Sequence, residues 1–192
     1  RALGELVGGS DNLMPHVKTH KAEAVARKQV ESGVVGFKCA TLSEAEMALN
    51  AGGKEVVLAY PLTQRIKAER FADLAAENAE ALVVAIVSRP EHVDLLGRVA
   101  QERGTVLRAM VDLDVGMHRT GVEVGAGAAD LYRQAAAHPH IEMRGLHIYD
   151  GHDHYGDPAE RAQVAQVHID EVRGLVQALR DEGPSPQQIA VK

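Results

Sequence analysis

The sequence predicts an α/β fold, a (β/α)8 TIM-type barrel of which about seven βα units are present. Short apolar, β-branched stretches alternate with longer helical patterns, which is typical of βαβ units around a parallel sheet. The first stretch runs into Lys18, Thr19 and His20, without the glycine-rich turn of a doubly wound nucleotide fold. The chain has 192 residues, whereas a complete barrel has about 250, so we expect a barrel truncated at both ends.

Strands and helices are expected in strict alternation. We expect strands near residues 13–18, 34–39, 55–60, 81–87, 105–113, 143–149 and 188–191. We expect helices near residues 21–32, 43–51, 64–77, 90–103, 125–137 and 158–182, and the chain opens on a further helical pattern. Four glycines occupy positions where helices are expected to end: Gly33, Gly52, Gly104 and Gly183.

Several helix starts carry capping residues. Thr41 with Glu44, and Ser88 with Glu91, read as capping boxes, in which the first side chain caps the helix and the second reaches back. Asp157 stands before the last helix, where a carboxylate accepts from free backbone amides.

Composition narrows the class of protein. Aromatic residues make up 3% and Trp is absent, so the core must consist of Ala, Val, Leu and Ile. A net charge of −6 argues against nucleic acid or an anionic membrane as a partner. No apolar run approaches the roughly 18 residues of a membrane span. The single cysteine, Cys39, excludes an internal disulfide, reads as a small buried residue and fits a cytoplasmic location.

Histidines gather where a barrel carries its chemistry. In a βα barrel the active site lies at the carboxyl ends of the strands and in the loops that follow. Six of the ten histidines fall at such positions: His16, His20, His118, His147, His152 and His154. The alternative is that these six histidines are solvated loop residues without a functional role.

The first expected strand carries a lysine between two histidines. Strand alternation would place His16, Lys18 and His20 on one face. Desolvation and positive neighbours would lower the pKa of a lysine in a barrel mouth and favour the neutral amine that attacks aldehydes. An equally weighted alternative is that Lys18 and Lys21 are surface lysines at the start of a helix.

Two later strands also end in polar residues. Asp112 and Asp114 share a face of the fifth strand, and Arg119 is the expected partner of these carboxylates, either in a binding site or in a structural ion pair. The sixth strand places His147 and Tyr149 on one face. The loop after it, residues 150–154, lacks the spacing of a known metal motif, so a solvated loop is favoured and no metal ligand is assigned.

Four segments resemble one enzyme family in the same order along the chain. They are Pro15–Lys21, Cys39–Glu46, Asp112–Gly121 and Gly145–His152. The chain is similar to the D-threonine aldolase and D-serine dehydratase family of fold-type III pyridoxal phosphate enzymes, which are related to the N-terminal barrel of alanine racemase.

The resemblance implies roles for individual residues. Lys18 matches the lysine that holds pyridoxal 5'-phosphate as a Schiff base, and Arg119 matches the arginine at the cofactor's phenolic oxygen. Tyr149 matches the side chain set against the pyridine ring. His16 and His20 match the family's paired histidines, counted here as catalytic, while Asp112 and His147 are expected among the cofactor-binding residues. Alanine racemases have a lysine at the position of Asp112, so this residue favours the aldolase and dehydratase side.

The resemblance also implies parts that this chain lacks. Residues 1–192 would be a partial pyridoxal phosphate-binding barrel domain, with the phosphate cup and a C-terminal β domain missing. That β domain would carry a divalent metal site, and the full-length protein is expected to be a homodimer.

The implied activity is a pyridoxal phosphate-dependent lyase acting on small D-β-hydroxy-amino acids, by retro-aldol cleavage or by dehydration. An amino-acid racemase is the first alternative. A non-catalytic carrier of pyridoxal phosphate is an alternative of another class.

Overall fold

A curved parallel sheet forms the centre of the molecule. The computed structural model describes residues 2–181 and 190–191. Within them the strands follow the order β1-β2-β3-β4-β6-β7, with β5 beside β4, and every pairing is parallel. The strands are β1 (Gly36–Cys39), β2 (Glu55–Leu58), β3 (Leu82–Val87), β4 (Leu107–Asp114), β5 (Val122–Glu123), β6 (Ile141–Ile148) and β7 (Ala190–Val191).

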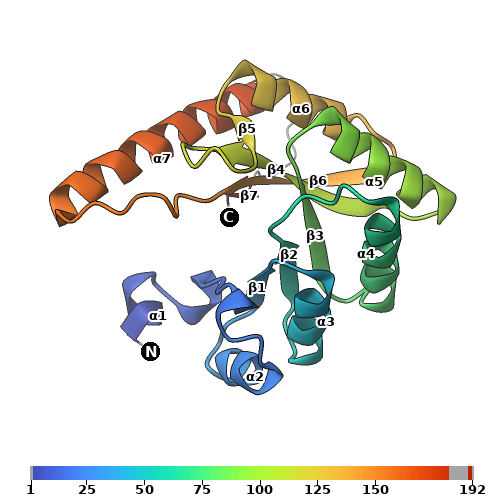
Figure 1. Ribbon diagram of the computed structural model, residues 1–192, viewed down its shortest axis with the longest axis horizontal. Helices are drawn as coiled ribbons and strands as arrows, with labels where there is room; N and C mark the ends of the chain where they lie inside the picture. Colours follow the sequence, from blue (N-terminus) through green and yellow to red (C-terminus); the bar gives the residue numbers. More distant parts are fainter. Residues whose placement is uncertain (1, 182–189, 192) are drawn as a thin grey trace.

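Helices cover the convex face of this sheet (Figure 1). The helices are α1 (Ala2–Leu6), which lies at the open side beside η1, and α2 (Glu23–Glu31), α3 (Leu42–Asn50), α4 (Arg65–Glu77), α5 (Pro90–Glu102), α6 (Ala126–Ala136) and α7 (Pro158–Asp181). The 3-10 turns are η1 (Ser10–Asn12) and η2 (Val17–Thr19). From β1 to β7 strands alternate with helices, except that the short β5 follows β4, and this order confirms the expected α/β fold, a partial TIM-type barrel.

Different hydrophobic clusters pack on the two faces of the sheet. The main core lies between strands and helices and contains residues of both, such as Phe37 of β1 and Phe71 of α4. A second, smaller cluster consists of Val57, Val84, Ile86 and Met110, which point to the other face of their strands. This second face is the concave inside of the barrel, and its apolar floor lies below the polar strand ends.

The prediction of a first strand over residues 13–18 is wrong. Residues 13–18 form no strand; His16 makes one isolated parallel bridge to Lys38, and η2 begins directly after it. The turn forms because the His16 ring accepts a hydrogen bond from the Lys18 backbone amide, at 3.2 Å, which bends the chain. The alternation used for His16, Lys18 and His20 therefore does not apply.

The remaining boundaries agree to within about two residues, apart from three omissions. The short strand β5 and the turns η1 and η2 were not expected. Of the last strand, expected over 188–191, residues 188 and 189 lie outside the described residues, as does the end of the last helix at residue 182. Gly33, Gly52 and Gly104 have positive φ angles of 94°, 100° and 62°, which are typical of helix ends. Gly183 lies outside the described residues.

The capping predictions hold in part. The Thr41 hydroxyl accepts from the Glu44 amide at 3.2 Å, but the Glu44 carboxylate accepts from the amide of Ala40 rather than that of Thr41. The box at Ser88 is wrong, because α5 begins one residue later and the Ser88 amide donates to His92 instead. Asp157 caps α7 as expected, accepting from Ala159 at 2.9 Å.

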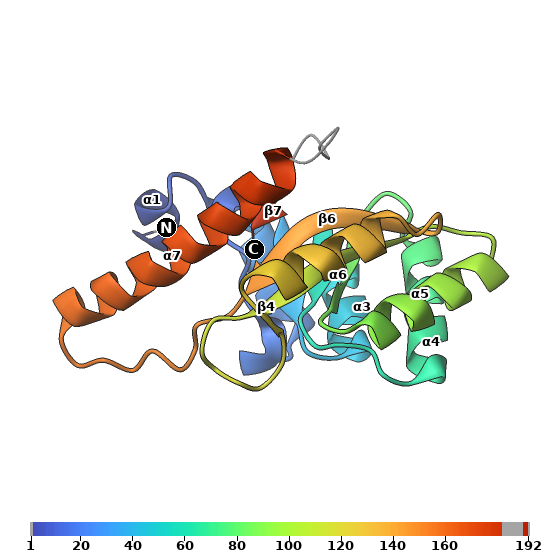
Figure 2. The ribbon, with the colours of Figure 1, turned by 90° about the horizontal axis from the view of Figure 1, so that it is seen from above.

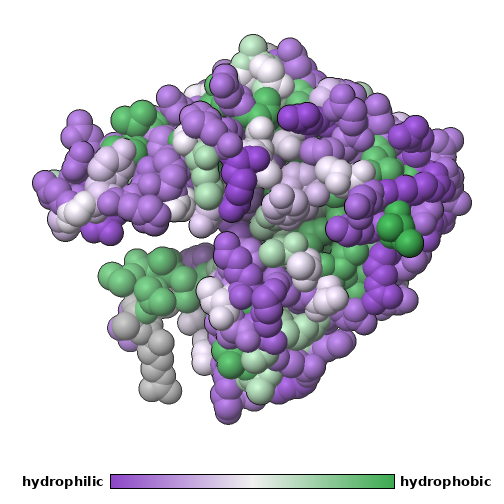
Figure 3. Space-filling model, viewed as in Figure 1, coloured by the Kyte–Doolittle hydropathy of each residue, from purple (hydrophilic) through white to green (hydrophobic). Residues whose placement is uncertain are grey.

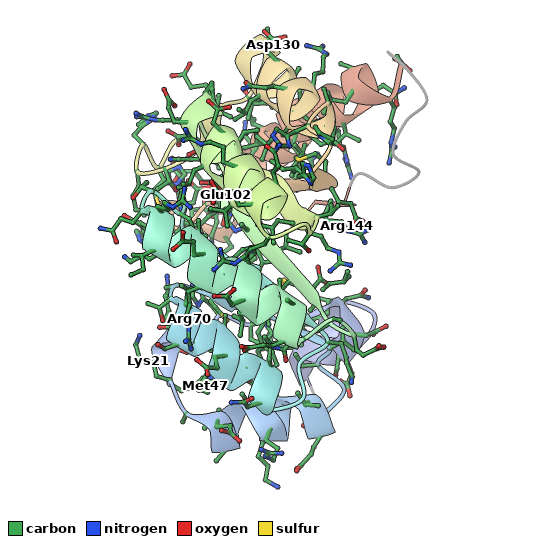
Figure 4. All side chains as sticks on the ribbon, turned by 90° about the vertical axis from the view of Figure 1, so that its right-hand side faces the viewer. Lys21, Met47, Arg70, Glu102, Asp130 and Arg144 are labelled. Carbon is green, nitrogen blue, oxygen red and sulfur yellow. The ribbon has the colours of Figure 1, made fainter. Side chains whose placement is uncertain are left out.

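The outer surface is polar, and the opposite side is open. Figure 4 shows charged side chains on the helix-covered side, where Arg70 pairs with Glu46 and Arg65 pairs with Glu102. Such exposed pairs contribute little to stability. Figure 3 shows the molecule hollowed between the apolar α1 segment and the region of α7. Within the described residues no pairing joins β7 to the His16 segment, so the sheet is an open arc.

None of the helices in the described ranges has both the length and the apolar character that crossing a membrane requires. Cys39 is buried in the main core, and burial first, with the nearby Glu44 charge, raises the pKa of its thiol to about 12. This thiol is a packing residue, as expected from the sequence.

Candidate active site

Polar side chains meet above the apolar floor of the concave face. They come from the η2 turn, from the end of β4 and the loop after it, and from the end of β6. All these segments end at the same rim because the strands are parallel, and this rim is where barrels carry their active sites.

A buried acid–imidazole pair joins β4 and β6. His147 lies directly opposite Asp112 in the strand register, and His147 Nδ1 is 2.6 Å from Asp112 Oδ1. Both side chains are about 95% buried, at 5% and 4% exposure. A carboxylate oxygen only accepts, so Nδ1 carries the proton of this hydrogen bond.

Burial keeps the His147 ring neutral. It is the largest influence lowering the pKa of His147, and the charges of Lys38 and Arg119 act in the same direction, against the hydrogen bond to Asp112. With Nδ1 protonated, Nε2 of the neutral ring is an acceptor. His147 Nε2 and Asp112 Oδ2 are both buried without a hydrogen-bond partner among the described residues. This pair can therefore receive a donor from a bound molecule.

The η2 turn presents a lysine beside a neutral histidine. Burial first, and then the Lys18 charge, lower the pKa of His16 to about 4. The ring is therefore neutral near pH 7, with Nδ1 accepting from the Lys18 amide and the proton on Nε2. The Lys18 side chain is exposed, so the desolvation expected of a lysine inside a barrel mouth is not found.

Two cations converge on one aromatic ring. Lys18 Nζ is 5.4 Å from the centroid of the Tyr149 ring, and Arg119 Cζ is 5.1 Å from the same centroid. Both distances lie within the range of cation–π contacts. Lys18, Arg119 and Tyr149, expected at one site from separate parts of the sequence, are thus neighbours. They come from the η2 turn, the loop after β4 and the end of β6.

Arg119 does not pair with the carboxylates of β4, which corrects the expected ion pair. Asp112 bonds to His147, and Asp114 accepts from the amides of Gly116 and His118 and contacts the His118 ring at 2.9 Å. Burial opposes ionisation of Asp114, but these hydrogen bonds hold its pKa below the ordinary value. Asp114 therefore shapes the loop, and Arg119 is left directed at Tyr149.

His20 ends the η2 turn, and Lys21 follows it. His20 Nδ1 accepts from the Ala22 amide at 3.1 Å, and its Nε2 is buried without a partner among the described residues. Lys21, at a positive φ of 47°, pairs with the buried carboxylate of Glu44. Burial acts against ionisation of Glu44, but its bonds from Lys21 and Ala40 hold its pKa below the usual value. Lys21 thus fastens the turn and is not the lysine presented to the site.

Sequence reasoning missed Lys38. It lies opposite His16 across the isolated bridge, and its charge lowers the pKa of both His16 and His147. The signal was available in β1, where Phe37 and Cys39 are buried in the main core and Lys38 between them must face the inside.

A hollow of about 390 Å³ opens at the rim beside this site. Its lining combines loop residues after β2, β3 and β4, and includes Arg119, Asp114 and His118. A small molecule can therefore reach Arg119 from the solvent side.

The whole chain, residues 1–192, matches the family described as alanine racemase, N-terminal domain. It is similar to a 3-hydroxy-D-aspartate aldolase of Paracoccus denitrificans (strain Pd 1222), with 30% identity over 177 residues, 91% of this chain and 45% of that protein. It is also similar to a D-threonine aldolase of Arthrobacter sp, with 28% identity over 172 residues, 89% of this chain and 45% of that protein.

The fold agrees with these relatives. The crystal structure of D-threonine aldolase from Filomicrobium marinum superimposes with a TM-score of 0.88 and 30% identity. The match covers 98% of this chain and 51% of that one. This chain therefore spans about half the length of the relatives it matches.

Proposed function

The chain belongs to the family of the alanine racemase N-terminal domain, and from this we propose that it is the barrel of a pyridoxal phosphate-dependent lyase acting on D-β-hydroxy-amino acids. The relatives named above as aldolases support this class of reaction. The observation that carries the proposal is the convergence of Lys18 and Arg119 on the Tyr149 ring.

The described residues fit the cofactor that this family implies. An aldehyde needs an accessible amine, and Lys18 is exposed at the rim. A flat heteroaromatic ring needs a surface to pack on, which Tyr149 offers, and a phenolic oxygen needs a charged donor, which Arg119 offers. The buried, unpartnered atoms of His147 and Asp112 are the kind of acceptors that a bound ring with a donor would satisfy.

Each residue then has a definite task. Lys18 would hold the cofactor covalently through its amine, and Tyr149 would orient the ring against it. Arg119 would donate to the phenolic oxygen. His16, neutral because of its lowered pKa and with its proton on Nε2, can donate a hydrogen bond from that nitrogen to a bound molecule. Asp112 would fix the tautomer of His147, so that Nε2 remains an acceptor.

When bound, pyridoxal phosphate supplies the electron sink for breaking a bond at the substrate α-carbon. The residue that removes the substrate proton is left open between His16 and His20, as the sequence left it. We further propose that the full-length protein uses a divalent metal, held outside these 192 residues, that would lower the pKa of the substrate β-hydroxyl, since an alcohol proton is too weakly acidic for a neutral base alone.

Aldol cleavage and dehydration both stay open, and so does racemisation as a different outcome on the same cofactor. The hydrogen bond from His147 to Asp112 favours the lyases, because it gives a carboxylate a built-in partner at the position where racemases have a lysine. We also propose a small D-amino acid as the substrate, a homodimer as the form of the full-length protein, and the cytoplasm as the location.

The test is a product assay with the full-length protein. D-threonine, D-serine and D-alanine would be supplied with pyridoxal phosphate, with and without a metal chelator. Glycine and an aldehyde from D-threonine would establish the aldolase, and a keto acid with ammonia would establish the dehydratase. Interconversion of the alanine enantiomers that resists the chelator, with neither lyase product, would overturn the proposal in favour of a racemase.

A further inference from the structure

Three side chains that the proposed lyase does not use form a partly buried cluster between a loop and a helix. His152 and Asp153 belong to the loop that joins β6 to α7, and His168 lies within α7. The donor atoms of the three side chains all lie within 4.8 Å of one another. We propose that His152, Asp153 and His168 bind a divalent transition metal, with Zn²⁺ as the ion that fits best.

The separations suit a metal. His152 Nε2 is 3.1 Å from Asp153 Oδ1, and His168 Nε2 is 3.5 Å from Asp153 Oδ2. Bonds of about 2.0–2.2 Å in a tetrahedral zinc site place neighbouring donor atoms roughly 3.3–3.6 Å apart. The 3.5 Å separation lies in this range, and the 3.1 Å separation is slightly shorter. The two imidazole rings have centroids 5.9 Å apart, and each approaches a different oxygen of the carboxylate.

Burial gives the second argument. The Asp153 side chain is 6% exposed, and neither of its oxygens receives a hydrogen bond from the described residues. The same holds for Nδ1 of His152 and for both ring nitrogens of His168. The imidazole nitrogens approach the carboxylate closely, but not in the geometry of a hydrogen bond. Buried carboxylates are paired, hydrogen-bonded or bound to metal, and a cation between the three groups would bond to the carboxylate and to one nitrogen of each imidazole.

The donor set selects the class of ion. Two imidazoles and one carboxylate suit Zn²⁺ and its transition-metal neighbours, whereas Mg²⁺ and Ca²⁺ prefer oxygen ligands throughout. Three protein ligands leave a fourth position for water. The ligands also fit the order of the chain, because His152 and Asp153 come from one tight turn and His168 comes from a separate element.

The site would fasten the segment that follows Tyr149. In Figures 1 and 2 the loop runs alongside α7, whose first turns project beyond the sheet. His152 also packs on Gly116 of the loop after β4, where a Cβ atom would come within 2.9 Å of Nε2. A metal at this point would hold the Tyr149 loop, the Arg119 loop and α7 together. This inference does not rest on the lyase activity.

The test measures Zn²⁺ bound to the full-length protein after chelator treatment and dialysis. Metal bound elsewhere is common to all variants, so the readout is the difference between variants. His154 is the matched control, since it lies in the same loop and is exposed. We expect H152A and H168A each to lose one Zn²⁺ per chain, with affinity lowered at least a hundredfold, and H154A to stay within twofold of wild type.

Co²⁺ gives an independent signal, because coordinated Co²⁺ absorbs visible light through its d–d transitions. That band should form in wild type and H154A, and disappear in H168A and in D153N, which keeps the shape of the side chain. Circular dichroism would check that each variant is folded. Equal zinc content in H168A and H154A, or equal loss in both, would overturn the proposal.

Discussion

His147 lies directly opposite Asp112 because β6 contains one extra residue. Ala109 of β4 faces Met143, but Met110 faces Gly145, so Arg144 is bulged out of the ladder. Continuing the first register would place Leu146, which belongs to the main core, opposite Asp112. The bulge turns His147 to the inside of the barrel and brings its ring within 2.6 Å of the carboxylate.

The pair should contribute strongly to stability. We expect His147→Ala to lower the free energy of unfolding by about 3 kcal/mol, because it removes a charge-assisted hydrogen bond and leaves a buried carboxylate unpaired. Urea denaturation would measure this. The double variant with Asp112→Ala should cost less than the sum of the single variants. As control, the exposed His154→Ala should change stability by no more than about 0.5 kcal/mol. Equal effects of the two single histidine variants would contradict the assignment.

Stability should fall as the solution becomes acidic, partly through His16. The pKa of His16 is about 4 in the folded chain, against about 6.5 in the unfolded chain. Between these values the unfolded chain binds more protons, so unfolding becomes easier as the pH falls from about 6.5 to about 4, with no further loss below. His147 and His92, whose pKa values are also lowered mainly by burial, act in the same direction.

Replacing His16 by Asn should flatten this pH dependence without abolishing it. The measurement is the free energy of unfolding in urea at several pH values between 4 and 7. The exposed His154→Asn variant should keep the wild-type slope. Parallel curves for His16→Asn and wild type would show that His16 titrates at its ordinary value.

Substitutions at two glycines with positive φ angles would distinguish the cost of backbone strain from the cost of a steric clash. A Cβ atom at Gly121 would lie 2.5 Å from the Asp114 amide nitrogen, whereas one at Gly104 would meet nothing within 4 Å. Gly104→Ala should therefore cost about 1 kcal/mol, from its φ angle alone. Gly121→Ala should cost at least about 3 kcal/mol, and should also displace the loop that carries Arg119. Thermal unfolding would measure the loss of stability in both variants, and an equal loss would contradict the predicted clash at Gly121.

The alternation of strands and helices was predictable because the two periodicities differ along almost the whole chain. Buried parallel strands read as apolar runs, and helices as longer amphipathic stretches that end at glycine. The segment 13–18 misled because it has the composition of a strand. Its turn depends on a hydrogen bond from the Lys18 amide to the His16 ring, which composition does not encode.

The sequence predicts which residues lie at the candidate site, but not which of them bond to one another. Spacing placed Asp112, Arg119 and His147 at the rim, yet it suggested the wrong partner for Asp112. The bulge at Arg144 decides that partner, and its one sign in the sequence is Gly145 inside a strand, which has a φ of 134°. His168 was read as part of a helix, because only the path of the loop reveals that it faces Asp153.

Arg119 should contribute to cofactor affinity. Arg119→Ala removes one charge-assisted hydrogen bond, worth roughly 1.5–3 kcal/mol, so the dissociation constant for pyridoxal phosphate should rise about tenfold to a hundredfold. Arg119→Lys keeps the charge but loses the planar guanidinium group, so its dissociation constant should lie between those of the wild type and Arg119→Ala. Absorbance titration measures the affinity. Arg161→Ala, an exposed arginine of α7, is the control, and an equal loss there would contradict a specific contact.

Lys18 should be the lysine that bonds to pyridoxal phosphate. It is exposed and lies 5.4 Å from the Tyr149 ring centroid, while Lys21 is held by the buried Glu44 carboxylate. Borohydride reduction of the cofactor-loaded protein, followed by peptide mapping, should find the pyridoxyl group on Lys18. Lys18→Ala should abolish the label, and Lys21→Ala should retain it, although loss of its ion pair loosens the η2 turn. A label on Lys21 or Lys38 in the wild-type protein would reject the assignment, because the amine beside Tyr149 would then not be the reactive one.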